Sequence, residues 1–336
     1  MAKWYDDSGF QNDIVLSTRV RLARNIKDIP FPGKMTDADG ALVVEKVENA
    51  LKRLNMNFAK TDIPSATIPE KNRLVEKRFI SPGFVSNQRP SAVFVSDDES
   101  ISIMVNEEDH IRFQAIYAGF ECEKAYEIIS KVDSVVAETV DYAVHQKYGY
   151  LTSCLTNAGT GIRISFMMHL PAICKARVAE SLFSAISKLG VTVRGMFGEG
   201  SKASGYLFQV SNQMTLGVTE KEIADRVTEV VNKLIAKERE LRAEIHQKEG
   251  MVIEDKIMRA EGILKSARLL STKEMLNLFS YVRFGISVGL IRDIDSRTLN
   301  LLMVETGPAH LTKEKDDPVQ RDMERATRVR NELKEE

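Results

Sequence analysis

The chain has 336 residues, 43% of them hydrophobic and 28% charged, and its formal net charge is −1. This composition is typical of a globular protein long enough for about two domains, and the total charge does not favour nucleic-acid binding. The three cysteines are widely spaced, which argues against a disulfide framework or a zinc knuckle and indicates a reducing compartment.

The sequence also lacks segments that would direct the protein to a membrane. No run approaches the roughly 18 apolar residues that a membrane span needs. The start, MAKWYDDSGF, has no basic stretch followed by an apolar one, as a signal peptide has. We therefore expect a cytoplasmic protein with no membrane partner and no direct nucleic-acid partner.

Up to residue 250 the apolar spacing alternates between helical and strand-like periods. Thr36 with Asp39 three residues later is a helix-start signal, and apolar residues then recur at helical spacing. The predicted elements are a helix over 36–54, strands of a meander at 92–95, 101–105 and 111–117, a helix over 123–147, strands at 149–154 and 161–170, a helix over 172–189, strands at 191–197 and 206–211, and a long helix over 219–249. This order predicts an α+β fold with helices on one side of an antiparallel sheet.

After Gly250 the pattern is helical to the end, with predicted helices over 252–269, 272–289 and 295–304 and a last one from 319. We therefore expect two domains, an α+β domain over 1–250 and a small all-helical domain over 251–336. The apolar residues of the second domain are interpreted either as core or as a dimer contact.

The first candidate site is STRVRLAR at 17–24. In an extended segment Arg19 and Arg21 point to one face, while the valine between them points to the other. Two guanidinium groups side by side, preceded by Ser17 and Thr18, suit a polyphosphate because each can bind phosphate oxygens bidentately. An exposed edge strand with solvated arginines is the alternative.

The second candidate site is NEEDHIR at 106–112, which lies between two predicted strands. Successive side chains diverge from extended backbone, so these acidic residues and the histidine would not converge on one metal ion, and we expect no protein-held metal. Two interpretations stay open, a solvated hairpin and a site in which Glu108 acts as acid or base. Arg112 is expected on the side of the sheet away from the core.

Two glycine-containing segments complete the set. Cys154 stands at a strand end before a polar turn and Arg163, where it is either a small packing residue or a reactive thiol. In 193–202, Arg194 and Glu199 flank glycines, but the spacing does not match a phosphate-binding P-loop. The segments share arginines beside short polar or glycine-rich backbone, which indicates one triphosphate site built from side-chain charges.

These motifs resemble the phosphagen kinases, and more closely the bacterial protein-arginine kinases of the McsB type, which belong to the ATP:guanido phosphotransferase superfamily. The residues that carry the resemblance are STRVRLARN, NEEDHIR, SCLTNAGTGIR, VRGMFGEGS and QVSNQMTLG, in the order of that family. The resemblance implies an antiparallel-sheet catalytic domain that transfers the γ-phosphate of ATP, with Mg²⁺, to a guanidino group.

The resemblance also implies residue roles. Glu108 would bind the acceptor guanidinium and act as base, Glu199 would be its partner, and Cys154 would lie against the guanidinium. Arg78 would stack on the adenine. The arginines implied to hold the phosphates are Arg19, Arg21, Arg112, Arg163 and Arg194.

The last predicted helix contains RDMERA at 321–326, which is similar to the phosphoarginine-binding element of the bacterial family. Arg321 and Arg325 are four residues apart on one helix face and could clamp a phosphate, and Asp322 could pair with the guanidinium of the ligand. A charged, solvent-facing tail helix is the alternative.

The leading hypothesis is therefore a kinase for arginine side chains of proteins. The resemblance implies that it marks proteins for Clp-type proteolysis, controls a heat-shock repressor, and works with a Clp ATPase, a zinc-containing activator protein and a second copy of itself. The first motif begins at residue 17, without the helical domain that precedes it in the small-molecule kinases, which favours a protein acceptor. The alternatives are a small-molecule guanidino kinase and a catalytically weak adaptor that binds phosphoarginine.

Overall fold

The computed structural model describes residues 3–196, 204–312 and 317–334. Its centre is an antiparallel sheet in the strand order β2-β3-β4-β5-β1-β8-β10-β9. The strands of this sheet are β1 (Val15–Arg24), β2 (Phe58–Asp62), β3 (Ala92–Ser96), β4 (Ile101–Val105), β5 (Ile111–Ala118), β8 (Ile162–His169), β9 (Val191–Gly195) and β10 (Leu207–Asn212). The predicted α+β class and the meander are confirmed.

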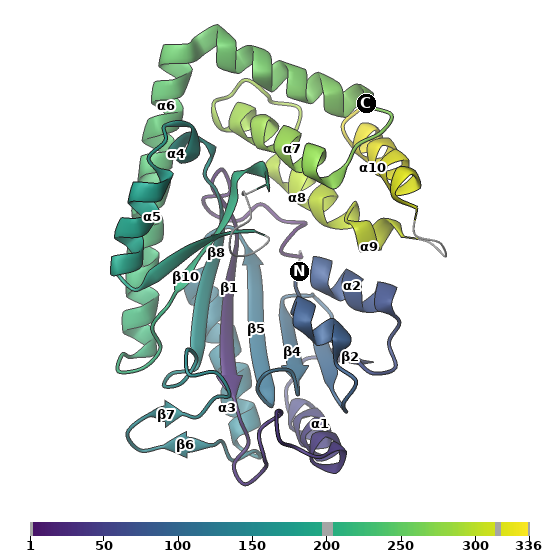
Figure 1. Ribbon diagram of the computed structural model, residues 1–336, viewed down its shortest axis with the longest axis vertical. Helices are drawn as coiled ribbons and strands as arrows, with labels where there is room; N and C mark the ends of the chain where they lie inside the picture. Colours follow the sequence, from purple (N-terminus) through teal and green to yellow (C-terminus); the bar gives the residue numbers. More distant parts are fainter. Residues whose placement is uncertain (1–2, 197–203, 313–316, 335–336) are drawn as a thin grey trace.

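One face of the sheet is covered by helices α1 (Asp37–Leu51), α3 (Cys122–Ala137) and the first half of α6 (Glu220–Ser266) (Figure 1). Apolar residues alternate along the strands, so Leu22 on β1 and Phe113 on β5 lie opposite each other in the core between the sheet and these helices. Thr36 caps α1 in a capping box with Asp39, as its spacing predicted.

The other face is not bare, which differs from the prediction of helices on one side only. At one end of the sheet Val93 and Met104 pack in a second small cluster with Phe84, which belongs to η1 (Pro82–Ser86). Helix α2 (Ile68–Glu76) packs against η1. The arginine-bearing strands β5, β1 and β8 follow this covered end in the strand order.

Several predicted boundaries were wrong. The helix predicted over 123–147 ends at Ala137, and the strand predicted at 149–154 is two residues long, β7 (Gly149–Tyr150) paired with β6 (Val144–His145). The helix predicted over 172–189 is split into α4 (Pro171–Lys175) and α5 (Ala179–Lys188), because Arg177 between them has a positive φ of 60°.

The predicted helices 219–249 and 252–269 form one element, α6, which bends at Gly250 and then crosses over the C-terminal helices (Figure 1). These helices are α7 (Thr272–Ser287), α8 (Ser296–Glu305), α9 (Pro308–Leu311) and α10 (Pro318–Glu332). The division into domains at residue 250 stays a prediction.

Contacts join the C-terminal helices to the sheet end that carries α2. Glu76, the last residue of α2, accepts hydrogen bonds from the backbone nitrogens of Ala309 and His310 on α9, at 2.7 and 3.1 Å.

Within the described ranges, no helix is both long and apolar enough to cross a membrane.

Candidate active site

Arginines from several strands share the face of the sheet opposite α3. Arg21 on β1 lies directly opposite Arg163 on β8, so their side chains point to the same side. Arg19 lies two residues before Arg21 on that face, and Arg112 on β5 is paired with Ala23 of β1. Antiparallel pairing therefore gathers charges from three segments that are distant in the sequence.

The face of the sheet that carries Arg19, Arg21, Arg112 and Arg163, here called the arginine face, is crowded with like charges. Burial, with the neighbouring charges of Arg78, Arg112 and Arg163, lowers the pKa of Arg19 to about 9. Burial and the same kind of crowding hold the pKa of Arg21 well below its usual range. The Nε atoms of Arg21 and Arg163 and the Nη2 atom of Arg78 are buried and have no hydrogen-bond partner among the residues that the structure describes. Buried cationic donors without acceptors are costly, and a polyanion with several oxygens fits them.

A pocket of about 260 Å³ opens on this face. It brings the predicted residues Arg21, Glu108, Arg112, Cys154 and Arg163 to one place. The other lining residues are Ala23, Thr156, Asn157 and Gly161. Cations, a carboxylate and a thiol from three separate chain segments thus meet in one pocket.

Two carboxylates compete for one cation at the edge of the pocket. Arg112 Nη2 lies 2.7 Å from Glu107 Oε2 and 2.9 Å from Glu108 Oε2. Ser81 Oγ also donates to Glu107 at 2.6 Å, whereas the side chain of Glu108 is 43% exposed and faces the pocket. Partial burial raises the pKa of Glu108, against the lowering effect of Arg112. Glu108 is therefore the carboxylate that an incoming cationic group can reach.

The other residues of the NEEDH segment hold the turn, a role that the sequence did not reveal. Asn106 has a positive φ of 62° and donates from Nδ2 to the carbonyls of Gly40 and Pro90. Asp109 is fully buried, and its Oδ1 accepts from the backbone nitrogen of Ser153 at 2.7 Å. The turn that presents Glu108 is thus tied directly to the loop that presents Cys154.

Asn25 joins this arrangement and was also missed. Its Nδ2 donates to Asp109 Oδ1 at 2.7 Å, and its Oδ1 accepts from the backbone nitrogen of His110 at 2.8 Å. His110 Nδ1 accepts from the backbone nitrogen of Ile26, and burial lowers the pKa of the imidazole. His110 is therefore a structural residue. Across residues 3–196, 204–312 and 317–334, no group of three or more His, Cys, Asp or Glu side chains could hold a metal ion.

The Cys154 loop is anchored on both sides. Cys154 Sγ lies 3.0 Å from Thr156 Oγ1, and the thiol is the only one of the three in the pocket lining. Thr215 Oγ1 lies within 2.9 Å of the carbonyl oxygens of Thr156 and Ala158. By contrast, burial raises the pKa of the Cys122 thiol to about 11, as expected for a packing residue.

The remaining predicted residues are placed differently. Thr18 lies on the core face of β1, where its hydroxyl donates to the Gly119 carbonyl at 2.6 Å, so it does not reach the arginine face. Ser17 is buried beside it. Arg194 is exposed on β9, and burial together with the charges of Arg194 and Arg112 lowers the pKa of Arg163. Glu199 lies outside the described residues.

Arg78 follows α2 with a positive φ of 66°, and its guanidinium carbon lies 4.9 Å from the Trp4 ring centroid. Burial lowers its pKa to about 10. It therefore joins the arginine face from a loop, already stacked on an aromatic ring.

The predicted phosphoarginine-binding residues lie on α10 with unequal exposure. Arg325 is 1% exposed, and its Nε and Nη1 donate to the carbonyls of Thr306 and Leu270. Arg325 Nη1 also pairs with Asp322, while Arg321 is half-buried. Arg325 therefore joins α10 to the connection between α6 and α7 and to the end of α8, and its contact with a ligand stays a prediction.

Two family models match the chain. The model of the ATP:guanido phosphotransferase C-terminal catalytic domain matches residues 42–241, and the model of the protein-arginine kinase McsB C-terminal domain matches residues 250–336. A protein-arginine kinase of Clostridium acetobutylicum is 45% identical over 314 residues, which cover 93% of this chain and 92% of that protein. One of Caldanaerobacter subterraneus subsp. tengcongensis is 42% identical over 331 residues, 96% and 98% of the two chains.

Solved structures share the fold. Lombricine kinase superposes with a TM-score of 0.64 and 24% identity, over 70% of this chain and 69% of that chain. The duplicated taurocyamine kinase from Schistosoma mansoni with bound transition state analog components gives a TM-score of 0.61 and 24% identity, over 66% and 32% of the two chains. At this identity the likeness extends to the fold alone.

Proposed function

Because the chain belongs to the protein-arginine kinase family, we propose that its arginine face binds the triphosphate of Mg²⁺·ATP and that Glu108 receives an arginine side chain of a protein. The observation that carries this proposal is the convergence of Arg21, Arg112 and Arg163 with Glu108 and Cys154 in one pocket.

The nucleotide side of the site contains several arginines, of which Arg112 also pairs with Glu107 and Glu108. The buried nitrogens of Arg21, Arg78 and Arg163 that have no acceptor in the described part of the chain would supply donors for phosphate oxygens. Triphosphate binding would also compensate the buried charge and the mutual repulsion that together lower the pKa of Arg19 and Arg21. Mg²⁺ would arrive with the nucleotide and neutralise charge on the β- and γ-phosphates. These arginines would then stabilise the transferring phosphoryl group.

The acceptor side has to make a poor nucleophile reactive. An arginine guanidinium has a pKa above about 12 and does not attack while it is fully protonated. Glu108 would align the guanidinium and take its proton as the nitrogen–phosphorus bond forms and the bond from the γ-phosphorus to the β-bridging oxygen breaks, leaving ADP. Cys154 would lie against the same group from the opposite loop.

Finer assignments rest on the family. We propose Clp-directed marking of proteins, control of a heat-shock repressor, a Clp ATPase and a zinc-containing activator as partners, a homodimer, and a cytoplasmic role in the stress response. We also propose that the C-terminal helices regulate the site allosterically. The contact of Glu76 with α9 supports such a route, since α2 leads directly to Arg78.

The test is phosphoryl transfer from ATP to an unstructured arginine-containing protein and, separately, to free arginine, with phosphate mapped by mass spectrometry under conditions that preserve nitrogen–phosphorus bonds. We expect phosphoarginine on the protein. Arg21→Met should abolish it, and the exposed Arg259→Met should not. Transfer only to free arginine would identify a small-molecule kinase. Binding of phosphoarginine without transfer would identify an adaptor.

A further inference from the structure

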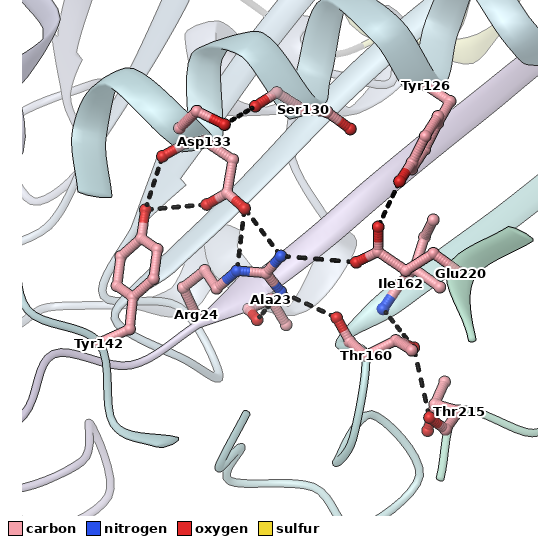
Figure 2. A network of polar contacts seen from close by, with 11 residues as sticks. Ala23, Arg24, Tyr126, Ser130, Asp133, Tyr142, Thr160, Ile162, Thr215 and Glu220 are labelled. Carbon is pink, nitrogen blue, oxygen red and sulfur yellow. Dashed lines mark hydrogen bonds and ion pairs between the residues drawn. The ribbon is translucent and has the colours of Figure 1, made fainter. Parts of the chain in front are cut away.

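Arg24 ends β1 on the core face of the sheet, opposite the arginine face, and is the centre of a buried polar network (Figure 2). It is 1% exposed. Its Nε and Nη2 donate to Asp133 Oδ2 on α3 at 3.1 and 2.7 Å, and Nη2 lies 3.8 Å from Glu220 Oε1 at the start of α6. Two carboxylates therefore compensate this buried charge, and the pairing fixes the guanidinium plane.

The remaining side of the guanidinium contacts the segment 150–160. Arg24 Nη1 donates to the Thr160 carbonyl at 3.0 Å, and the guanidinium carbon lies 3.6 Å from the centroid of the Tyr150 ring. Tyr150 and Gly159 exchange two backbone hydrogen bonds, at 2.8 and 3.1 Å. The Arg24 side chain therefore contacts both ends of the segment, at Tyr150 and at Thr160.

The fit at this point is close. Gly161 has a positive φ of 68°, and a Cβ there would lie 2.6 Å from Arg24 Nη1 and 2.6 Å from the Ala23 carbonyl oxygen. Between the two ends, the segment carries Cys154 and Thr156 into the pocket. A shift of the guanidinium would thus move the base of the loop that forms the acceptor side.

We propose that Arg24 is a positioning residue that sets the Cys154 loop for the acceptor arginine. This inference rests on the proposed kinase site. Arg24 touches no pocket atom assigned to nucleotide or acceptor, and it acts through Thr160 and Tyr150. The planar fork is needed because it donates to Asp133 and to the loop at once while stacking on a ring, which a lysine ammonium cannot do.

The test compares Arg24→Lys with Asp133→Asn. Lysine keeps a positive charge beside Asp133 but loses the bond to Thr160 and the flat stacking on Tyr150. Asparagine keeps an oxygen for the Arg24 guanidinium and leaves the bond to Thr160 in place, so it weakens the buried ion pair without releasing the loop. Each variant is measured for hydrogen exchange of the free protein and for the KM of ATP and of an arginine-containing protein.

For Arg24→Lys we expect exchange at Tyr150, Gly159 and Thr160 to accelerate about tenfold, and KM for the protein acceptor to rise about tenfold, the scale of one lost charge-assisted hydrogen bond. The KM for ATP should change less than about twofold, because the arginine face is untouched. Asp133→Asn should lower the unfolding midpoint while loop exchange and acceptor KM stay close to those of the natural protein.

Unchanged loop exchange in Arg24→Lys would overturn the proposal. So would equal acceleration across the whole sheet, or an acceptor KM that rises as much in Asp133→Asn, because either would indicate general destabilisation. If the natural protein transferred no phosphate, the proposed function would fail, while the exchange comparison would still decide whether Arg24 holds the loop.

Discussion

Arg112 Nη2 lies 2.9 Å from Glu108 Oε2, so the carboxylate proposed to receive the acceptor is paired with a cation proposed to bind nucleotide. Glu107 contacts the same nitrogen at 2.7 Å and would remain paired with Arg112 if Glu108 moved away. The nucleotide and the acceptor arginine would therefore each bind one partner of the Arg112–Glu108 ion pair. Phosphate oxygens that attract Arg112 would free Glu108 for the acceptor guanidinium.

This exchange predicts that nucleotide strengthens acceptor binding. Adding Mg²⁺·ADP should tighten the binding of an arginine-containing peptide by about tenfold, a coupling of roughly 1.4 kcal/mol. Isothermal titration of the peptide with and without nucleotide measures it. In Arg112→Met the coupling should vanish, because no cation remains to be moved. Equal peptide affinity under both conditions in the natural protein would contradict the exchange.

A second prediction concerns pH. Partial burial raises the pKa of Glu108, so kcat/KM should fall as the pH drops through a value above that of an ordinary glutamate. Arg112 favours the ionised carboxylate, so Arg112→Met should move this acid limb to higher pH.

A raised folded pKa also means that the stability contributed by protonated Glu108 is present at low pH and is lost as the pH rises through the folded pKa. The pH–rate profiles of the two proteins provide the check, and an acid limb unaffected by the substitution would count against the assignment.

A third prediction separates function from stability at Arg21. Arg21→Met removes a buried donor, one with no acceptor among residues 3–196, 204–312 and 317–334, from a cluster of like charges. We expect the free energy of unfolding of the ligand-free protein to rise by about 1–3 kcal/mol, the scale of one unsatisfied buried group. ATP affinity should fall at least about tenfold, since one bidentate phosphate contact is lost.

Chemical denaturation and nucleotide titration measure the two effects of Arg21→Met. Arg259, which is exposed on α6 and pairs with Asp255, supplies the matched substitution, and Arg259→Met should leave both quantities unchanged. A less stable Arg21→Met protein with normal ATP affinity would show that Arg21 is structural.

A fourth prediction concerns α10. Arg325→Ala would leave the carbonyls of Thr306 and Leu270 without a donor, so the free energy of unfolding should fall by about 2–4 kcal/mol. Arg321→Ala should cost far less stability because Arg321 is half-buried. If α10 binds phosphoarginine, Arg321→Ala should weaken binding of a phosphoarginine peptide while the fold is retained. Thermal unfolding and peptide binding distinguish the two arginines, and similar losses of stability would contradict these placements.

The local sequence pattern was sufficient to predict that the arginines of β1 lie on one face of the sheet. Period-two alternation predicted that Arg19 and Arg21 share one side of a strand, and the register places Arg163 beside them. The Thr36–Asp39 capping box could also be predicted, because its two residues are only three positions apart. Thr18 was assigned with Ser17 and Arg19 because they are adjacent, although alternation itself places Thr18 on the core face.

What the sequence could not predict depends on contacts between distant segments. Asp109 joins Asn25 and Ser153, which are 84 and 44 residues away, and no local pattern indicates such partners. Helix α2 and strand β2 were missed because each is short and depends on packing against its neighbours. The sequence also did not reveal that the helices predicted over 219–249 and 252–269 form the single bent element α6, because a glycine between two charged helical runs gives the same local signal for a bend and for a helix end.

The most direct test of the account is the rate of a single phosphoryl transfer from saturating ATP to an arginine-containing protein by Glu108→Gln, with the exposed Glu123→Gln as the matched control. The account predicts a loss of at least about 10²-fold for Glu108→Gln, the scale of general-base catalysis, with ATP affinity and the fold retained. The control should transfer phosphate at the rate of the natural protein. A Glu108→Gln protein that transfers phosphate at the control rate would contradict the assignment of Glu108 as the acceptor carboxylate and base.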